Sequence, residues 1–526
     1  MKTRFVLLAL ACVLVAMPAT AQVNYLYNSG VPGVMVIGSP NASGDIVIAS
    51  TDAGSPVVWI NGSAFSGCTN LTSVAIPSSV TVIQSPVFSG CRRLMNITVD
   101  AANPAFGSLD GVLFNKAQTT LIAFPPGRGS YVIPSSVTSI GPSAFVNCTA
   151  LTNVTIPDSV TSIGPAAFAG CTSLTNVTIP NGVTGIGSRA FSGCTGLTNI
   201  TIPNSVISIE GSTYSGCTNL TSVTIGNSVT SLGYLPFDGC KSLTNFSLAA
   251  ANPAYSSIDG VWFNKAQTTL GLFPPGRSGS YVIPNSVTNI GDRAFYDCTS
   301  VTSVTIPNGV ISIGNQAFFG CTNLTSVTIP DRVTQIGTTL HAGGGRAFAS
   351  CTSLTNVIIG HSVTNIGSGA FYACSNLTRL TIPASVINLG YAAFFGSSRL
   401  TNFTFLGNPP RLIFDMNGGF AQFQDVGAGA KVYYSCGTTG WGASYGPLPT
   451  VMVCPPGIAP GGAGVKPGGF GFTVTRLTNQ AIVIEASVNL VNWQPISTNP
   501  PPGPSADFVD PAWLQHPARF YRARSE

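Results

Sequence analysis

The chain has 526 residues, of which only 7% are charged, and its formal net charge is +5. This charge is dilute and no Lys/Arg cluster exists, so nucleic acid and acidic membranes are not expected as partners. Although 44% of the residues are hydrophobic, no stretch beyond the N-terminus has the roughly 18 consecutive apolar residues of a membrane-spanning helix. The apolar residues are therefore expected in a folded core, with Ser, Thr, Asn and Gly supplying the surface.

The first residues have the pattern of an export signal. Lys2 and Arg4 precede an apolar run over residues 5–17, and Ala19-Thr20-Ala21 fits the small-x-small cleavage pattern. The sequence therefore predicts a signal peptide over 1–21 and a mature protein that a bacterium secretes or displays on its cell surface. Residues 22–54 contain two strand-like runs and are expected to cap the first coil of the repeat region that begins at residue 55.

Residues 55–403 are dominated by a 23-residue repeat. The repeat is exemplified by CTSLTNVTIPNGVTGIGSRAFSG, which begins at Cys171 and ends at Gly193. A 23-residue period lies within the range of leucine-rich repeats. Eleven cysteines occupy the same repeat position, mostly at intervals of 23 residues: Cys68, Cys91, Cys148, Cys171, Cys194, Cys217, Cys240, Cys298, Cys321, Cys351 and Cys374.

Each repeat predicts a short parallel strand. Leu174, Val177 and Ile179 are apolar at the spacing i, i+3, i+5, which is the L-x-x-L-x-L pattern of a turn that leads into a strand. Because side chains alternate along a strand, Asn176 and Thr178 are expected to point outward. One coil cannot bury its own apolar face, so consecutive coils must stack into a solenoid with parallel sheets.

The consensus I-P-x-S-V-T-x-I-G-x-x-A-F-x-x-C-x-x-L-T-x-V-T-I-P recurs over about two thirds of the chain. It resembles the BspA-type (Treponema-type) leucine-rich repeats of bacterial surface and secreted proteins. The resemblance implies a mainly β fold of 23-residue leucine-rich coils.

Two near-identical blocks, 103–116 and 252–265, interrupt the 23-residue spacing. Each places an Asp-Gly pair, at Asp110 and at Asp259, between apolar runs. An Asp-Gly pair in this setting is typical of a tight hairpin turn, so each block is predicted to be a variant coil with a hairpin.

The repeat decays after residue 403. Residues 404–454 are predicted to form a C-terminal cap, in which Val432-Tyr433-Tyr434 adds the last strand and Trp441 covers the core. The Pro- and Gly-rich stretch 455–469 is interpreted as a linker. Residues 470–526 resemble a small β-domain that ends secreted proteins of Verrucomicrobia-like bacteria, and a sandwich-like fold is expected for them.

The cysteines leave two alternatives open. Stacked coils would place the ladder cysteines about 5 Å apart, which permits either disulfides or a buried row of free thiols. We favour free thiols. Cys436 and Cys454 lie outside the ladder and are candidates for a disulfide with each other. Because none of the cysteines forms a C-x-x-C pair, a zinc site is not expected.

Nothing in the sequence indicates catalysis, and no catalytic residue, cofactor or metal ligand is predicted. The sequence has only three histidines. His361 occupies a turn position, and His341 lies in a Gly-rich insertion that we interpret as a bulge between coils. The recurring Asp110 and Asp259 are explained by their turns.

The outward faces of the predicted strands are the candidate binding surface. They form an uncharged ladder of hydroxyls and amides, from which Arg379, Ile358 and Tyr214 depart. The candidate binding surface consists of this ladder and Arg379: Asn153, Thr155, Asn176, Thr178, Asn199, Thr201, Ser222, Thr224, Ser303, Thr305, Ser326, Thr328 and Arg379.

The sequence therefore favours a non-enzymatic interaction protein that binds an extracellular protein or polysaccharide through the repeat surface. Two alternatives remain. One is a structural component of the cell envelope, anchored or sorted by the C-terminal domain. The other is an enzyme that acts on polysaccharide. The ladder can also simply solvate the sheet.

Overall fold

The computed structural model describes residues 23–27, 33–338, 344–414, 421–435 and 437–453, and the strands and a few adjoining residues between 457 and 525. The described residues contain no α-helix, and the one helical element among them is the 3-10 turn η1 (Ala421–Phe423). The predicted mainly β solenoid is confirmed. The chain divides into unit 1 (residues 1–279 and 286–302) and unit 2 (residues 280–285 and 303–526). The predicted signal peptide lies outside the described residues.

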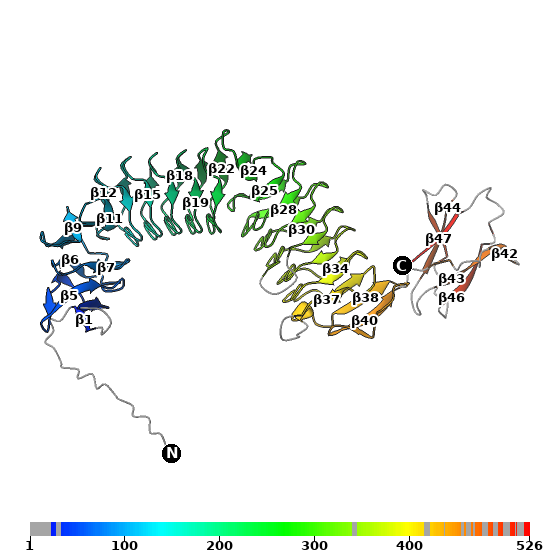
Figure 1. Ribbon diagram of the computed structural model, residues 1–526. Helices are drawn as coiled ribbons and strands as arrows, with labels where there is room; N and C mark the ends of the chain where they lie inside the picture. Colours follow the sequence, from blue (N-terminus) through cyan, green and yellow to red (C-terminus); the bar gives the residue numbers. More distant parts are fainter. Residues whose placement is uncertain are drawn as a thin grey trace, which may run out of the picture. The chain divides into compact units, whose positions relative to one another are not determined.

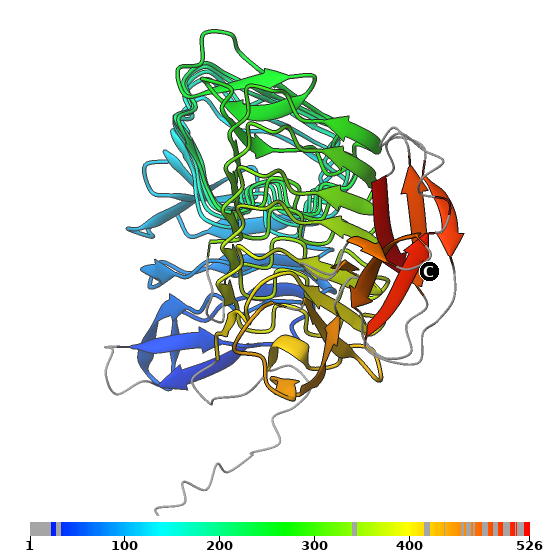
Figure 2. The same cartoon turned by 90° about the vertical axis from the view of Figure 1, so that its right-hand side faces the viewer.

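In unit 1, each regular coil adds one strand to one side of the solenoid, which is the longer strand in all but one coil, and one two-residue strand to another side. The strands β14 (Asn153–Thr155) and β16 (Asn176–Val177) are parallel, and their paired residues are 23 positions apart. We call the outward side of the longer strands the strand face, and the side formed by the two-residue strands the short-strand side. The coils stack one behind another in Figure 1, and their outlines nearly superpose in Figure 2.

The longer strands of unit 1 also include β3 (Gly44–Val47), β6 (Leu71–Ile76), β8 (Asn96–Val99), β12 (Ser130–Val132), β18 (Asn199–Ile202), β20 (Ser222–Ile225) and β22 (Asn245–Leu248). The two-residue strands are β7 (Val82–Ile83), β13 (Ser139–Ile140), β15 (Ser162–Ile163), β17 (Gly185–Ile186), β19 (Ser208–Ile209), β21 (Ser231–Leu232) and β27 (Asn289–Ile290). The N-terminal end also contains β1 (Asn24–Tyr27), β2 (Val34–Ile37), β4 (Thr51–Asp52) and β5 (Ser55–Ile60). The strands β1 and β2 are antiparallel, and β5 pairs in parallel with β2 and β7.

The third side of each coil is the turn that carries the Ala-Phe-x-x-Cys motif. In one coil, Ala166 and Gly170 adopt positive φ angles of 52° and 74°, and the equivalent positions repeat this conformation along the stack. The N–H of Phe168 between them donates to the carbonyl of Ala190 in the next coil at 2.7 Å. Backbone hydrogen bonds therefore join neighbouring coils on all three sides.

The core is built from identical side chains stacked in rows. The rings of Phe145 and Phe168 lie 4.7 Å apart with nearly parallel planes, and the row continues to Phe191 at 5.1 Å. A parallel row of cysteines lies beside it, and the leucine, valine and isoleucine positions complete the apolar interior. Because every coil repeats the same residues, each row packs against a copy of itself, which explains the strict sequence period.

The two duplicated blocks form the predicted hairpins. In the first block, β9 (Phe106–Leu109) and β10 (Val112–Asn115) are antiparallel around Asp110-Gly111, and β11 (Thr120–Ala123) follows. The second block repeats this with β23 (Tyr255–Ile258), β24 (Val261–Asn264) and β25 (Thr269–Leu272). The buried Asn103 anchors the first hairpin, since its amide donates to two carbonyls and its oxygen accepts from two backbone N–H groups. Asn252 makes the same four bonds in the second.

Unit 2 continues the same pattern. Its longer strands are β30 (Ser326–Thr328), β32 (Asn356–Ile358), β34 (Arg379–Ile382), β36 (Asn402–Phe405), β38 (Lys431–Ser435) and β40 (Leu448–Val453). Its short-strand side holds the two-residue strands β29 (Ser312–Ile313), β31 (Gln335–Ile336), β33 (Asn365–Ile366), β35 (Asn388–Leu389) and β37 (Arg411–Leu412). The two-residue strand β39 (Ser444–Tyr445) pairs instead with β40. The strands β26 (Gly279–Val282) and β28 (Val301–Thr305) contain residues of both units.

The predicted end of the solenoid needs one correction. Residues Val432-Tyr433-Tyr434 do form a strand, β38, which pairs in parallel with β36. It is not the last strand, however, because β40 pairs with the other edge of β38. Trp441 packs against the rings of Phe405 and Tyr434, as expected for a side chain that closes the core.

The C-terminal residues form a separate pair of sheets. One sheet holds β41 (Gly457–Ile458), β42 (Gly464–Lys466), β43 (Gly469–Thr475) and β46 (Ser505–Asp510), and the other holds β44 (Ile482–Ser487), β45 (Gln494–Ser497) and β47 (Phe520–Ser525). Phe472 of the first sheet and Ile484 of the second share one small core. Two of these strands, β41 and β42, fall inside the stretch 455–469 that the sequence suggested was a linker. That interpretation missed them because Gly- and Pro-rich strands lack the alternation on which strand prediction depends.

Candidate functional site

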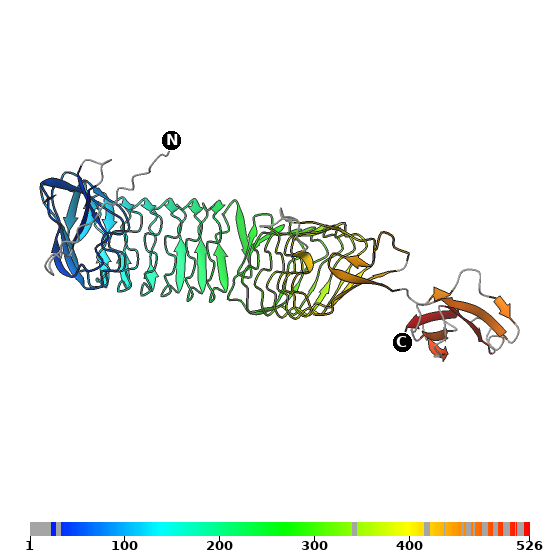
Figure 3. The ribbon, with the colours of Figure 1, turned by 90° about the horizontal axis from the view of Figure 1, so that it is seen from below.

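The strand face of unit 1 carries two columns of outward side chains. In one column, Ser130, Asn153 and Asn176 are paired in register across β12, β14 and β16. The second column lies two residues further along each strand, where Thr155 and Thr178 are exposed. From β12 to β22 none of the twelve outward positions is charged: Ser130, Val132, Asn153, Thr155, Asn176, Thr178, Asn199, Thr201, Ser222, Thr224, Asn245 and Ser247. Figure 3 shows these coils from a direction at right angles to that of Figure 1.

An open groove of about 680 Å³ runs over this face between Ile156 and Ala249. Five of the predicted surface residues line it, namely Asn176, Thr178, Asn199, Thr201 and Thr224. The side chains of all but Asn199 make no hydrogen bond with another described residue, so their donors and acceptors face solvent. Asn199 differs, since its oxygen accepts from Thr221 and Ser222. The volume lies within the range of ligand sites, which is roughly 300–1,000 Å³.

A hairpin tip lies next to each end of this neutral stretch. Gly111 of the first hairpin accepts a hydrogen bond from the N–H of Ile97 in β8, and Gly260 of the second accepts one from Phe246 in β22. Arg128 donates to the carbonyl of Asp110 at 2.6 Å, and Arg277 makes the equivalent bond to Asp259. The two aspartates therefore shape turns, as predicted. Asp110 and Arg128 also line a second hollow, of about 720 Å³, together with Tyr131 and Asn153.

The strand face of unit 2 begins in the same way and then changes. Ser303, Thr305, Ser326 and Thr328 lie outward in the positions predicted for them, half-buried or exposed. Beyond them, Ile358 is 53% exposed and Arg379 is exposed. The structure thus places the predicted surface residues of each unit on the strand face of that unit.

The sequence and the structure disagree on whether three residues lie on the strand face. Tyr214 was predicted to interrupt the outward ladder, but this is wrong, because its ring is fully buried in the phenylalanine row between Phe191 and Phe237. The prediction overlooked that Tyr214 lies three residues before a ladder cysteine, which is the phenylalanine position. Conversely, the sequence missed Lys431 and Tyr433, which lie outward on β38.

The eleven ladder cysteines are free, buried thiols, as favoured from the sequence. Most donate to a phenylalanine carbonyl of the preceding coil, as Cys171 does to Phe145 at 3.0 Å. Burial raises the pKa of Cys91 and of Cys374 to about 12. Since the thiolate is the nucleophile and the metal ligand, these protonated thiols are structural. The predicted Cys436–Cys454 disulfide lies outside the described residues and stays a prediction.

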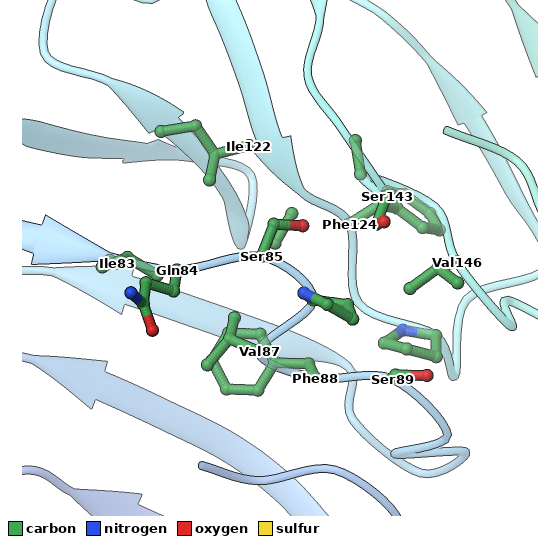
Figure 4. A pocket seen from close by; sticks show the side chains of 14 residues that line it. Ile83, Gln84, Ser85, Val87, Phe88, Ser89, Ile122, Phe124, Ser143 and Val146 are labelled. Atoms are coloured by element: carbon green, nitrogen blue, oxygen red, sulfur yellow. The ribbon is translucent and has the colours of Figure 1, made fainter. Parts of the chain in front are cut away.

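One hollow of unit 1 is too small to hold a substrate. The hollow drawn in Figure 4, beside Phe88 and Phe124, measures only about 10 Å³, which is the space of about one water molecule. Ser85 and Ser143 also line it, but no histidine or carboxylate does. Among the described residues no group of three His, Cys, Asp or Glu side chains could hold a metal ion. His361 lies exposed in its turn, as predicted, whereas His341 is outside the described residues.

The stacked coils and their rows of buried leucine, phenylalanine and cysteine define a leucine-rich-repeat solenoid. The chain belongs to the BspA type leucine rich repeat region family, whose pattern matches residues 46–126, 129–263, 277–344 and 344–412. The search of curated proteins finds no match. Within the described residues, no helix has the length and apolar character needed to cross a membrane.

Solved structures give the same assignment. A leucine rich cell surface protein from Faecalibacterium prausnitzii is 30% identical, with a TM-score of 0.50 over 73% of this chain and 93% of that one. A leucine-rich repeat protein from Bacteroides ovatus is 26% identical over 78% and 98% of the two chains, with a TM-score of 0.44. A leucine-rich repeat protein from Eubacterium ventriosum is 22% identical over 65% and 95%, with a TM-score of 0.50. The Faecalibacterium prausnitzii relative is a cell surface protein, and membership of this leucine-rich-repeat family suggests a non-enzymatic interaction role.

Proposed function

We propose that this chain is a secreted or cell-surface interaction protein of a bacterium, which binds an extracellular protein or polysaccharide through the strand face of unit 1. The observation that carries the proposal is the groove of about 680 Å³, whose lining includes Asn176, Thr178, Thr201 and Thr224 with unused hydrogen-bonding groups. Amides, hydroxyls and apolar side chains recur along the groove at each coil, with Asp158 as the one charged residue of its lining, and such a repeated surface suits a ligand that is itself extended and repetitive. Such a surface gains affinity from many weak contacts along the ligand.

The test blocks the groove and leaves the fold intact. The double variant T178R/T201R places two long charged side chains in the groove at exposed positions. The matched control T161R/T184R changes two exposed threonines of neighbouring coils on the short-strand side, where they donate only to carbonyls of the preceding coil. Both proteins are screened against host matrix proteins and a polysaccharide panel. We expect the first variant to lose at least tenfold in affinity and the control to retain it. Equal loss in both, or no binding by the unmodified protein, would contradict the proposal.

A second candidate function is a structural part of the cell envelope with the C-terminal domain as its anchor. It is favoured by one observation, the independent core that Phe472, Val474 and Ile484 form in that domain. Cells that produce the chain with and without residues 457–526, which hold all the strands of this domain, would be fractionated. Retention of only the longer chain in the envelope supports anchoring, and equal release of both into the medium excludes it.

A further inference from the structure

The last coils of unit 2 place two cations in the outward column that is uncharged in the middle of unit 1. Arg379 of β34, Asn402 of β36 and Lys431 of β38 are paired in register on three adjacent parallel strands. Neighbouring strands lie about 4.8 Å apart, so the backbones of the two cationic residues are roughly 10 Å apart with an amide between them.

Neither Arg379 nor Lys431 contributes a polar interaction to the fold of the described residues. Arg379 and Lys431 are exposed, and neither forms an ion pair or a side-chain hydrogen bond with a described residue. Other arginines of this unit differ, since Arg399 donates to Asn376 at 2.7 Å and Arg346 lies over the ring of Tyr372. The preceding coils have Ser303, Ser326 and Asn356 in the same column, so the repeat itself does not require a charge there.

The charge balance of this region favours an anionic ligand. Residues 303–453 contain six basic and three acidic residues, whereas residues 22–302 contain nine basic and ten acidic ones. Of the nearby described acids, Asp331 accepts a hydrogen bond from the N–H of His361, and Asp425 lies in a turn at a φ of 56°. Neither lies in the outward columns, so the positive field of Arg379 and Lys431 is not cancelled on the strand face itself.

The second outward column adds groups that suit a sugar. Thr381, Thr404 and Tyr433 are in register, and the ring of Tyr433 is half-buried two residues from Lys431. The oxygen of Asn402 accepts from Thr404, which leaves its two N–H donors available. An aromatic ring presents an apolar face and a polar tip, and amides and hydroxyls pair with sugar hydroxyls.

We infer that Arg379, Asn402, Lys431 and Tyr433 form a binding site for a carboxylated polysaccharide. The two cations pair with carboxylates on one polymer chain, since such a polymer repeats its charge along its length. Asn402 donates to sugar hydroxyls between them, and a sugar ring stacks on Tyr433. A protein partner fits less well, because protein interfaces concentrate energy in a desolvated apolar centre and these columns are mostly polar. This site is separate from the groove of unit 1, and its test does not depend on what that groove binds.

The test uses the full mature chain in calorimetric titrations with polygalacturonate. The matched ligand is the same polymer with its carboxylates methyl-esterified, which removes the charge and keeps the sugars. We expect binding to polygalacturonate that weakens as NaCl is raised, because salt screens exposed charges. Binding to the esterified polymer should be at least tenfold weaker.

The variants restore the consensus of the repeat, so they should fold. R379N/K431N makes the column match Asn356 and Asn402, and we expect at least a tenfold loss of affinity. The control R411N removes another exposed cation, from β37, where Asn388 is its register partner, and should leave affinity unchanged. Y433T, which matches Thr404, should lower the affinity for both polymers severalfold.

The inference is overturned if polygalacturonate does not bind, if the esterified polymer binds equally well, or if R411N costs as much as R379N/K431N. Equal or tighter binding of polyglutamate would assign the cations to an acidic protein and would overturn the polysaccharide assignment. Thermal melting of each variant establishes whether a loss of binding reflects unfolding. If R379N/K431N melts early, the milder R379K/K431R pair should fold and retain salt-sensitive binding, and loss of binding in that folded pair would also overturn the inference.

Discussion

The strand faces of unit 1 and unit 2 are built on the same interior and present different chemistry. In unit 1, the rings of Phe145 and Phe168 stack at 4.7 Å, and in unit 2 those of Phe318 and Phe348 stack at 4.9 Å. Outside that core, β12 to β22 of unit 1 expose uncharged side chains, whereas β34 and β38 of unit 2 expose Arg379 and Lys431. The repeat therefore fixes the inward positions and leaves the outward ones free. Departures from the consensus on the outward columns are the places to look for function.

The largest expected effect is a loss of stability, and it shows whether the interiors of the two units are equivalent. Phe168→Ala in unit 1 and Phe371→Ala in unit 2 each remove a fully buried ring from the stacked row. Each should cost about 3–5 kcal/mol, because a buried Phe→Ala change loses apolar burial and leaves a cavity. Chemical denaturation of the two variants measures these costs.

The control for this pair is the outward change Thr178→Ala, which should alter stability by less than about 0.5 kcal/mol. If one unit tolerated the loss of its ring and the other did not, the two interiors would not be equivalent. The difference between the strand faces would then reflect the coils as a whole.

The next prediction concerns a variant in which the cationic row of unit 2 is copied onto the strand face of unit 1. The triple variant N153R/N199K/T201Y copies the cation–amide–cation row and its tyrosine onto three successive coils of unit 1, with Asn176 in the middle. Because these positions point outward, the protein should fold, and its affinity for polygalacturonate should rise by about tenfold, equivalent to about 1.4 kcal/mol. Titration of the triple variant in the R379N/K431N background isolates the new site. Unchanged affinity in that background would mean that the row needs more of unit 2 than its outward side chains.

The sequence predicts the strand faces of the two units only where the 23-residue spacing is regular. The coils, the outward ladder and the hairpins at Asp110 and Asp259 were predictable because cysteines mark the register and Asp-Gly demands a tight turn. Arg379 could be placed on the strand face for the same reason. Lys431 could not, since it follows its register partner Asn402 by 29 residues and the 23-residue period no longer applies. The backbone hydrogen bonds between the turns that carry the Ala-Phe-x-x-Cys motif could not be predicted either. They depend on positive φ angles at residues such as Ala166, whose type does not indicate that conformation.

A smaller effect is expected where the core itself departs from its consensus. Tyr214 replaces phenylalanine in the row, and its buried hydroxyl has no hydrogen-bond partner among the described residues. A buried hydroxyl without a partner costs free energy that a phenylalanine avoids. Tyr214→Phe should therefore stabilise the protein by about 1 kcal/mol, seen as a higher denaturation midpoint with an unchanged slope. Destabilisation would show that the hydroxyl makes an interaction in solution, such as one with an ordered water molecule.

The smallest effect concerns a single charge in the coil that follows the second duplicated block. Asp297 follows the second hairpin at the position that Asn147 holds after the first, and both residues adopt positive φ angles near 50°. Burial, and then the charge of Asp238, raise the pKa of Asp297 above its ordinary value of 3.8, while Lys241 opposes the shift. The folded state therefore binds this proton more tightly than the unfolded state does. As the pH rises above 3.8 and through the raised pKa, the free energy of unfolding should fall by the contribution of this group.

Asp297→Asn removes that dependence and tolerates the same φ, since Asn favours this conformation. Because Asp297 is partly exposed, the gain at neutral pH should stay below about 0.5 kcal/mol. Melting curves of the variant and the unmodified protein from pH 3 to pH 7 should converge at the acid end and separate as the pH rises. The reverse trend, with the curves separating only in acid, would mean that the folded state stabilises the Asp297 carboxylate. Its negative charge would then favour the folded state.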